Sequence, residues 1–206
     1  AKESKLLEKL QDRGIRCEPV SPEVLLSMAT TVNPDGVVAM ARSHSATNHT
    51  ISVQSLGLIL ETIQDPGNVG TILRTAAAAG VEGIWLDQGC VDLESPKVLR
   101  SSAGAWFRVP TSCGEDLPAQ VQDYQNQGFQ VVATLPKANL DYWAVDYTQP
   151  TLILVGNEGA GLSDALRSTA TLQVSIPLSA GIESLNAAIA TAVILYEAKR
   201  QRSKIK

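Results

Sequence analysis

The chain has 206 residues and a mass of 21.9 kDa, with 44% hydrophobic and 18% charged residues, a balance that excludes a disordered chain. Its longest apolar stretch, residues 187–196, is about half of the ~20 residues that span a bilayer, so no transmembrane helix is expected. The formal net charge of −4 and the pI of about 5.2 exclude a generally basic nucleic-acid-binding protein.

The charge is uneven, because the last ten residues carry five basic groups against Glu197 alone. The charged opening, residues 1–10, lacks the basic-then-apolar order of a secretory leader. The three cysteines form no C-x-x-C pair, which favours a reducing compartment. We therefore expect a cytoplasmic protein.

The N-terminal residues predict a small α/β piece. A helix is expected over 4–13, closed by Gly14, then a strand over 16–20 and a helix that begins at Ser21 and Pro22. A turn over 33–36 precedes a short strand over 37–40. The polar stretch from Ser43 to Ser55 has the composition of a linker, so we place one domain at residues 1–50 and a second at 51–206.

From Leu56 onward, apolar runs alternate with helical stretches. The runs LILETI, GIWL, FQVVAT, TLILVG and LQVSIP predict a mostly parallel sheet with helices on its faces. The last helix is predicted over 184–202, where apolar residues at i, i+3, i+4 spacing give it one buried face.

Glycines follow two of these runs, at the carboxyl ends of strands where α/β sheets bind ligands. The loop after TLILVG has the length of a phosphate-binding loop, but Leu162 stands where that loop needs lysine. Glu158 likewise replaces the second glycine of the dinucleotide fingerprint, and its carboxylate would repel phosphate. The alternative is an ordinary glycine-rich turn.

The stretch after LILETI predicts a helix in which Asn68 is a candidate N-cap and Gly80 ends the last turn. Arg74 lies off the apolar stripe of this helix, facing either a cleft or only solvent.

A third polar cluster precedes the final helix, where Ser184 is a candidate N-cap and Asn186 lies in the first turn. Such a cluster beside an apolar run also suits a ligand with polar and apolar parts. The two histidines, His44 and His49, lie together in the polar stretch, and no metal-ligand spacing is present. Nucleophilic and metal catalysis are therefore weak candidates, and no metal site is predicted.

Taken in order, the three clusters resemble the signature motifs of SpoU-type (TrmH-like) RNA 2′-O-ribose methyltransferases of the SPOUT superfamily. The matching residues are Asn68-x-Gly70-x-x-x-Arg74, Gly156-Asn157-Glu158-x-x-Gly161-Leu-Ser, and Ile176-Pro177 with Glu183-Ser184-Leu185-Asn186. The stretch 101–110 also looks like this family. The resemblance covers residues 58–202 and implies a parallel sheet with a C-terminal trefoil knot, a feature that periodicity alone does not predict.

The resemblance implies S-adenosyl-L-methionine as cofactor and a ribose 2′-hydroxyl of RNA as acceptor. The implied cofactor-binding residues are Gly156, Asn157, Glu158, Gly161, Ile176, Pro177, Leu178, Leu185 and Asn186. The implied catalytic residues are Arg74, Asn68, Ser184, Glu158 and Asn186. Because a guanidinium is effectively always protonated, we expect Arg74 to hold the ribose and its phosphate rather than to act as the base.

The resemblance further implies a homodimer with the final helix near its interface, where alanines at 187, 188, 190 and 192 would permit close approach. The implied substrate is ribosomal RNA in preference to transfer RNA, and the basic C-terminal residues either contact phosphates or offset the helix dipole. Residues 1–42 match only the second half of the family's substrate-binding domain. Two alternatives stay open: a catalytically silent RNA-binding or assembly protein, and a methyltransferase for protein or small molecules.

Overall fold

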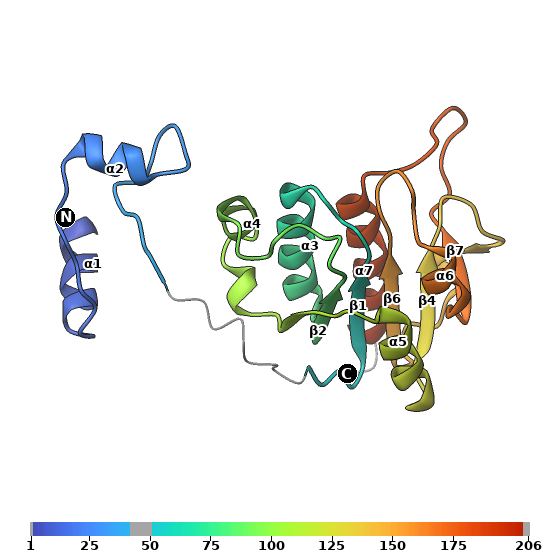
Figure 1. Cartoon of the computed structure of the whole chain (residues 1–206). Coiled ribbons are helices and arrows are strands. Elements are labelled where there is room, and N and C mark those ends of the chain that lie inside the picture. Colours follow the sequence, from blue (N-terminus) through green and yellow to red (C-terminus); the bar gives the residue numbers. More distant parts are fainter. Residues whose placement is uncertain (1, 42–50, 204–206) are drawn as a thin grey trace. The chain divides into compact units, whose positions relative to one another are not determined.

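The structure is a computed structural model that describes residues 2–41 and 51–203. The chain divides into two compact units, residues 1–46 and 47–206, and each is described by itself (Figure 1). Residues 43–50 of the expected linker, together with Lys204 and Lys206 of the basic end, lie outside the described residues.

The N-terminal unit contains two helices, α1 (Lys2–Gln11) and α2 (Pro22–Met28). Ser21 caps α2 by accepting a hydrogen bond from the Val24 N–H, and Gly14 takes a left-handed φ of 69° after α1. The strands expected over 16–20 and 37–40 are wrong for the described residues. Neither segment pairs with a neighbouring strand there, and without such pairing an extended segment forms no β-ladder.

The larger unit contains a seven-stranded sheet in which every strand pair is parallel, as expected. Its order is β3-β2-β1-β6-β4-β7-β5. The strands are β1 (Leu56–Leu60), β2 (Gly83–Leu86), β3 (Thr111–Cys113), β4 (Gln130–Thr134), β5 (Leu140–Asp141), β6 (Thr151–Val155) and β7 (Leu172–Ser175). The central strands β1 and β6 are buried along their whole length because helices cover both faces of the sheet.

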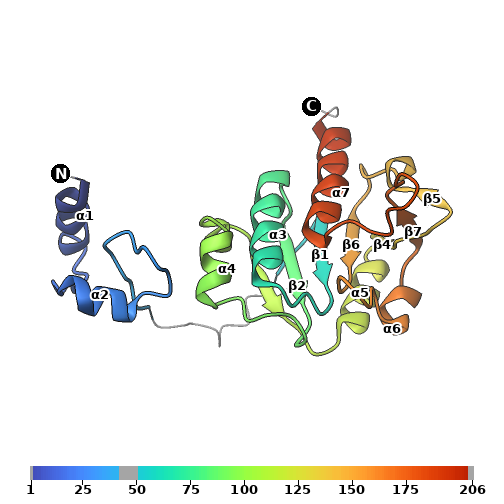
Figure 2. The same cartoon turned by 90° about the horizontal axis from the view of Figure 1, so that it is seen from above.

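Two layers of helices cover the sheet (Figure 2). One face is covered by α3 (Pro66–Ala79), α4 (Pro96–Ser101), the 3₁₀ turn η1 (Ala105–Phe107) and α7 (Ala187–Arg202). The other face is covered by α5 (Leu117–Asn126) and α6 (Asp164–Ser168), while the 3₁₀ turn η2 (Tyr142–Ala144) follows β5. Fully buried side chains such as Leu58 and Leu152 lie between the layers, and each contributes about 1.5–3 kcal/mol by leaving water.

Two helices begin at residues other than those expected. Asp65 caps α3 by accepting from the Asn68 N–H, and Pro66 takes the first helical position, so Asn68 is not the cap. Asn186 caps α7 by accepting from the Ala188 and Ile189 N–H groups, so Ser184 lies before the helix. Two side chains, those of Asn68 and Ser184, are thereby left for other contacts.

The end of the expected linker belongs to the larger unit. Ile51 and Val53 are buried, and they pack where Gly57 and Gly83 present no side chain. A Cβ on Gly83 would lie 2.1 Å from the Ile51 Cγ2, so the glycine is required by this packing. Among the described helices, none is both long and apolar enough to cross a membrane.

Candidate functional site

Four loops follow the carboxyl ends of β1, β6, β4 and β7, which are neighbours in the sheet. In open α/β sheets this edge is where ligands bind. The segments after β1, β6 and β7, including the start of α3, carry the three polar clusters singled out in the sequence, at residues 61–74, 156–163 and 176–186. The topology therefore brings all three clusters to one edge.

The glycine-rich loop after β6 has a defined shape. Asn157 and Gly161 exchange two backbone hydrogen bonds, and the Asn157 Oδ1 accepts from the Gly159 and Ala160 N–H groups at 2.9 Å each. A Cβ on Gly156 would lie 2.3 Å from the carbonyl carbon of Gly161 and 2.4 Å from the Leu162 nitrogen. The loop closes on itself at a distance that only glycine permits.

Three side chains from the three clusters are joined by hydrogen bonds, and we call Asn186, Asn68 and Glu158 the polar triad. The Asn186 Nδ2 donates to the Asn68 Oδ1 at 3.0 Å, and the Asn68 Nδ2 donates to the Glu158 Oε1 at 2.7 Å. Because Asn186 also caps α7, the start of that helix, the start of α3 and the loop after β6 are tied together. The carboxylate of Glu158 is held by a hydrogen bond in a fixed place.

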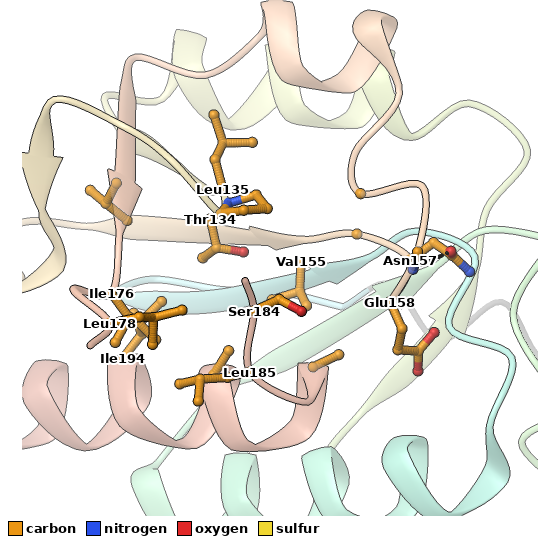
Figure 3. A pocket seen from close by; sticks show the side chains of 17 residues that line it. Thr134, Leu135, Val155, Asn157, Glu158, Ile176, Leu178, Ser184, Leu185 and Ile194 are labelled. Carbon is orange, nitrogen blue, oxygen red and sulfur yellow. Dashed lines mark hydrogen bonds between the residues drawn. The ribbon is translucent and has the colours of Figure 1, made fainter. Parts of the chain in front are cut away.

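A pocket of about 720 Å³, its open mouth included, lies beside the polar triad (Figure 3). Glu158 lies at one end of it, Ile176 and Leu178 lie at the other, and Ser184 lies between them. Most of its wall is apolar and comes from the ends of β4, β6 and β7 and from the start of α7. Its larger aliphatic side chains are Leu135, Val155, Val174, Ile176, Leu178, Leu185 and Ile194.

The predicted site residues are distributed unevenly around this pocket. Those that line it are Gly156, Asn157, Glu158, Gly161, Ile176, Leu178, Ser184 and Leu185. Pro177, Asn68 and Asn186 are not among the lining residues, and the two asparagines act instead within the polar triad. Arg74 is exposed on α3 and is also outside the lining, so the structure does not bring it to the pocket.

The sequence reasoning missed one wall of the pocket, formed by Thr134, Leu135 and Pro136 at the end of β4. Ligands bind at the carboxyl ends of parallel strands, and this rule applies to β4 as it does to β1 and β6. The residues that follow the predicted strand FQVVAT could therefore have been named as candidates. It also missed Ala187, Ala190 and Ile194 of α7, which line the pocket from the helix.

Two further chemistries gain no support from the described residues. No group of three or more His, Cys, Asp or Glu side chains gathers there in a way that could hold a metal ion. Burial raises the pKa of Cys90 to about 12, and Asp87 contributes to this shift, so the thiol is protonated at neutral pH and is a poor nucleophile.

Comparison with known proteins assigns both units. Residues 55–196 match the model of the SpoU rRNA methylase family, and residues 1–46 match the model for RNA 2′-O ribose methyltransferase substrate binding. These matches define the chain as an RNA methyltransferase.

This chain belongs to the SpoU rRNA methylase family. It is 49% identical over 197 residues to an uncharacterized tRNA/rRNA methyltransferase of Synechocystis sp., covering 96% of this chain and 72% of the relative. It is 32% identical over 185 residues to the 23S rRNA (guanosine(2553)-2′-O)-methyltransferase RlmP of Bacillus subtilis, covering 90% and 73%.

Solved structures agree with this assignment. The AdoMet-bound rRNA methyltransferase from Sinorhizobium meliloti superposes with a TM-score of 0.81 at 33% identity, over 97% of this chain and 77% of that one. The SpoU methyltransferase AviRb from Streptomyces viridochromogenes, in complex with AdoMet, gives 0.70 at 39% identity, over 75% and 64%. The α/β fold expected from the sequence is confirmed.

Proposed function

We propose that this chain transfers a methyl group from S-adenosylmethionine to a ribose 2′-hydroxyl of RNA, and that its substrate is ribosomal RNA. The observation that carries the proposal is the polar triad at the edge of the apolar pocket, which joins all three motifs of the family in one site. The choice of ribosomal over transfer RNA is supported by the Bacillus subtilis relative, whose name specifies 23S rRNA.

The pocket fits this cofactor better than it fits a phosphate-bearing nucleotide. Its apolar wall suits the adenine ring, and the carboxylate of Glu158 at one end suits a positively charged group. None of the described residues that line it is lysine or arginine, so a phosphate would find no cationic partner. When bound, S-adenosylmethionine supplies an activated methyl group on a cationic sulfur.

The residues of the chain then serve mainly to position the reacting groups. The polar triad holds Glu158 in place, and Ser184 lies over the middle of the pocket, where it is free to orient a hydroxyl group. Arg74 is exposed on α3, and a guanidinium carries five N–H donors in a fixed fork. Its role is to hold the ribose and the neighbouring phosphate of the RNA, for which a guanidinium offers two parallel N–H donors.

The proposal includes a homodimer formed through α7. Ile189, Val193 and Tyr196 follow one another at helical spacing, and Ile189 and Tyr196 are 52% and 51% exposed. Three of the four alanines expected at this interface are used differently, because Ala187 and Ala188 are buried within the chain and Ala190 lines the pocket. Ile189→Glu is expected to give a monomer in sedimentation at micromolar concentration, whereas Val32→Glu, at an exposed position of the N-terminal unit, leaves the dimer intact.

The basic end of the chain gives less support to RNA binding than its charge indicates. Lys199 donates to the Ala78 carbonyl, Arg200 pairs with Glu197, and Arg202 donates to two backbone carbonyls. These three cations therefore act within the chain.

We propose cytoplasmic localisation as well, which the three free cysteines support.

The decisive experiment uses S-adenosylmethionine labelled in the methyl group with unmodified ribosomal and transfer RNA. Digestion is expected to yield labelled 2′-O-methylnucleosides from ribosomal RNA. Arg74→Ala should abolish this label. The control Arg167→Ala, which replaces an exposed arginine of α6, should leave it unchanged. Arg74→Lys should lose nearly all activity if bidentate geometry is required. Cofactor binding without label in either RNA would favour a different acceptor, and no cofactor binding would favour a silent RNA-binding protein.

A further inference from the structure

The turn that follows β1 contains a residue in an unusual backbone conformation. Thr62 has a φ of 56°, in the left-handed region that a β-branched residue rarely adopts. Such conformations persist only where the surrounding structure enforces them, and they concentrate at functional sites. Thr62 lies at the edge of the sheet that carries the pocket, between β1 and α3.

Asp87, which follows β2, enforces this conformation. Its Oδ1 accepts a hydrogen bond from the Thr62 N–H, and its Oδ2 accepts one from the Thr62 Oγ1, both at 2.7 Å. Gly89 closes over the same side chain, since a Cβ there would lie 2.8 Å from the Thr62 Oγ1. One carboxylate thus fixes both the backbone and the side chain of Thr62.

The Thr62 carbonyl in turn determines where the glycine-rich loop begins. It accepts a hydrogen bond of 2.8 Å from the Nδ2 of Asn157, which lies 95 residues later in the sequence. The Oδ1 of the same Asn157 side chain accepts from the Gly159 and Ala160 N–H groups and so closes the loop. A peptide rotation at Thr62 would remove the acceptor that orients this side chain.

The far end of the loop is held from the same turn. The Glu61 Oε2 accepts a hydrogen bond of 2.7 Å from the Ser163 N–H. Residues 61 and 62 therefore hold residues 157 and 163, one on each side of Glu158, while Asn68 holds Glu158 itself. The segment between β1 and α3 acts as the support for the loop that lines the pocket.

We propose that Asp87 is a positioning residue for the glycine-rich loop at residues 157–161. It holds Thr62 in the left-handed conformation, and Thr62 in turn orients Asn157 and the loop. Asp87 does not line the pocket and is not a catalytic residue. The inference rests on the proposed use of S-adenosylmethionine, but the coupling between Asp87 and the loop exists in the free protein. That coupling is therefore testable without cofactor.

The test is a mutant cycle of Asp87→Ala, Thr62→Gly and the double variant, with Asp123→Ala as control because Asp123 is exposed on α5. Two quantities are measured: the dissociation constant of S-adenosylmethionine by calorimetry, and the amide hydrogen exchange of residues 157–161 in the free chain. Asp87→Ala is expected to weaken cofactor binding about tenfold and to speed amide exchange in the loop. The reason is that Thr62 loses both hydrogen bonds that hold its carbonyl in place for Asn157. Asp123→Ala changes neither.

The double variant distinguishes positioning from general destabilisation. Glycine adopts the left-handed region without penalty, so Thr62→Gly should restore cofactor binding and loop protection in the Asp87→Ala background. If the double variant is as impaired as Asp87→Ala, or if Asp87→Ala changes neither quantity, the proposal is wrong. A wild-type chain that binds no cofactor would contradict the proposed function, while loop exchange would still decide the role of Asp87.

A second pair of variants leaves Asp87 in place, in case its replacement prevents folding. Thr62→Val keeps the β-branched shape in the left-handed region but loses the hydroxyl that donates to Asp87. It is expected to speed loop exchange relative to wild type, whereas Thr62→Gly does not. Equal exchange in the two variants would overturn the proposal.

Discussion

Replacing Gly156 by alanine would place a methyl group against the backbone of the loop that follows β6. The added Cβ would lie 2.3 Å from the Gly161 carbonyl carbon and 2.4 Å from its oxygen, about 1 Å inside ordinary contact. Overpacking costs about 1–3 kcal/mol, and the obstacle here is backbone rather than a flexible side chain, so we expect about 3 kcal/mol. This corresponds to a more than hundredfold change in the folding equilibrium, on the order of 100–200.

The assay is urea unfolding followed by tryptophan fluorescence. All three tryptophans, Trp85, Trp106 and Trp143, lie in the larger unit, so the signal reports that unit alone. Gly159→Ala is the matched control in the same loop, because its Cβ would lie 3.5 Å from the Asn157 Oδ1, an ordinary contact. If the two variants are equally stable, the loop does not close as tightly as the geometry indicates, and the reasoning is refuted.

Two more predictions concern the backbone anchors of the larger unit. Partial burial raises the pKa of Glu82, but hydrogen bonds from the Gln54 and Ser55 N–H groups and the Ser55 hydroxyl, together with the charge of Arg202, lower it by more. The net pKa is below its ordinary value. The ionised Glu82 therefore stabilises the fold above its unfolded pKa of about 4.3, and this stabilisation is lost as the pH falls through its folded pKa. Glu82→Gln should make the free energy of unfolding, measured with urea, depend less on pH in the acid range. Arg202 donates to the Ser55 and Gln149 carbonyls at 2.8 and 2.9 Å, so Arg202→Lys should cost about 1–2 kcal/mol in thermal unfolding. Arg200→Lys, in a surface ion pair, should lower the melting temperature less. Equal melting temperatures for the two lysine variants would contradict this account.

The sheet could be predicted from the sequence because its strands are short, buried and apolar. Runs such as LILETI and TLILVG have no polar face, and this is typical of parallel strands covered on both sides. Their order could not be predicted, since no local pattern shows that β6 lies between β1 and β4. The trefoil knot, which only the resemblance implied, stays a prediction.

The helix starts show where local rules become ambiguous. Asp65 and Asn68 are both good N-cap residues, and so are Ser184 and Asn186. Pro66 favours Asp65 locally, but no such local signal favours Asn186, whose second contact, to Asn68, spans 118 residues. The site residues were found by family resemblance, whereas the hydrogen bonds that join them required the fold.

The position of β6 has a consequence for how the protein is made. β1 ends at Leu60, and its neighbour β6 does not begin until Thr151, so at ~5–20 residues per second the ribosome needs roughly 5–20 s to supply that partner. Throughout this time at least one edge of the apolar strand β1 is unpaired, the kind of surface on which nascent chains aggregate. The polar triad is completed still later, by Asn186. A newly synthesised chain therefore passes through a vulnerable period before it acquires a working site, and shielding by chaperones in that interval should govern its yield.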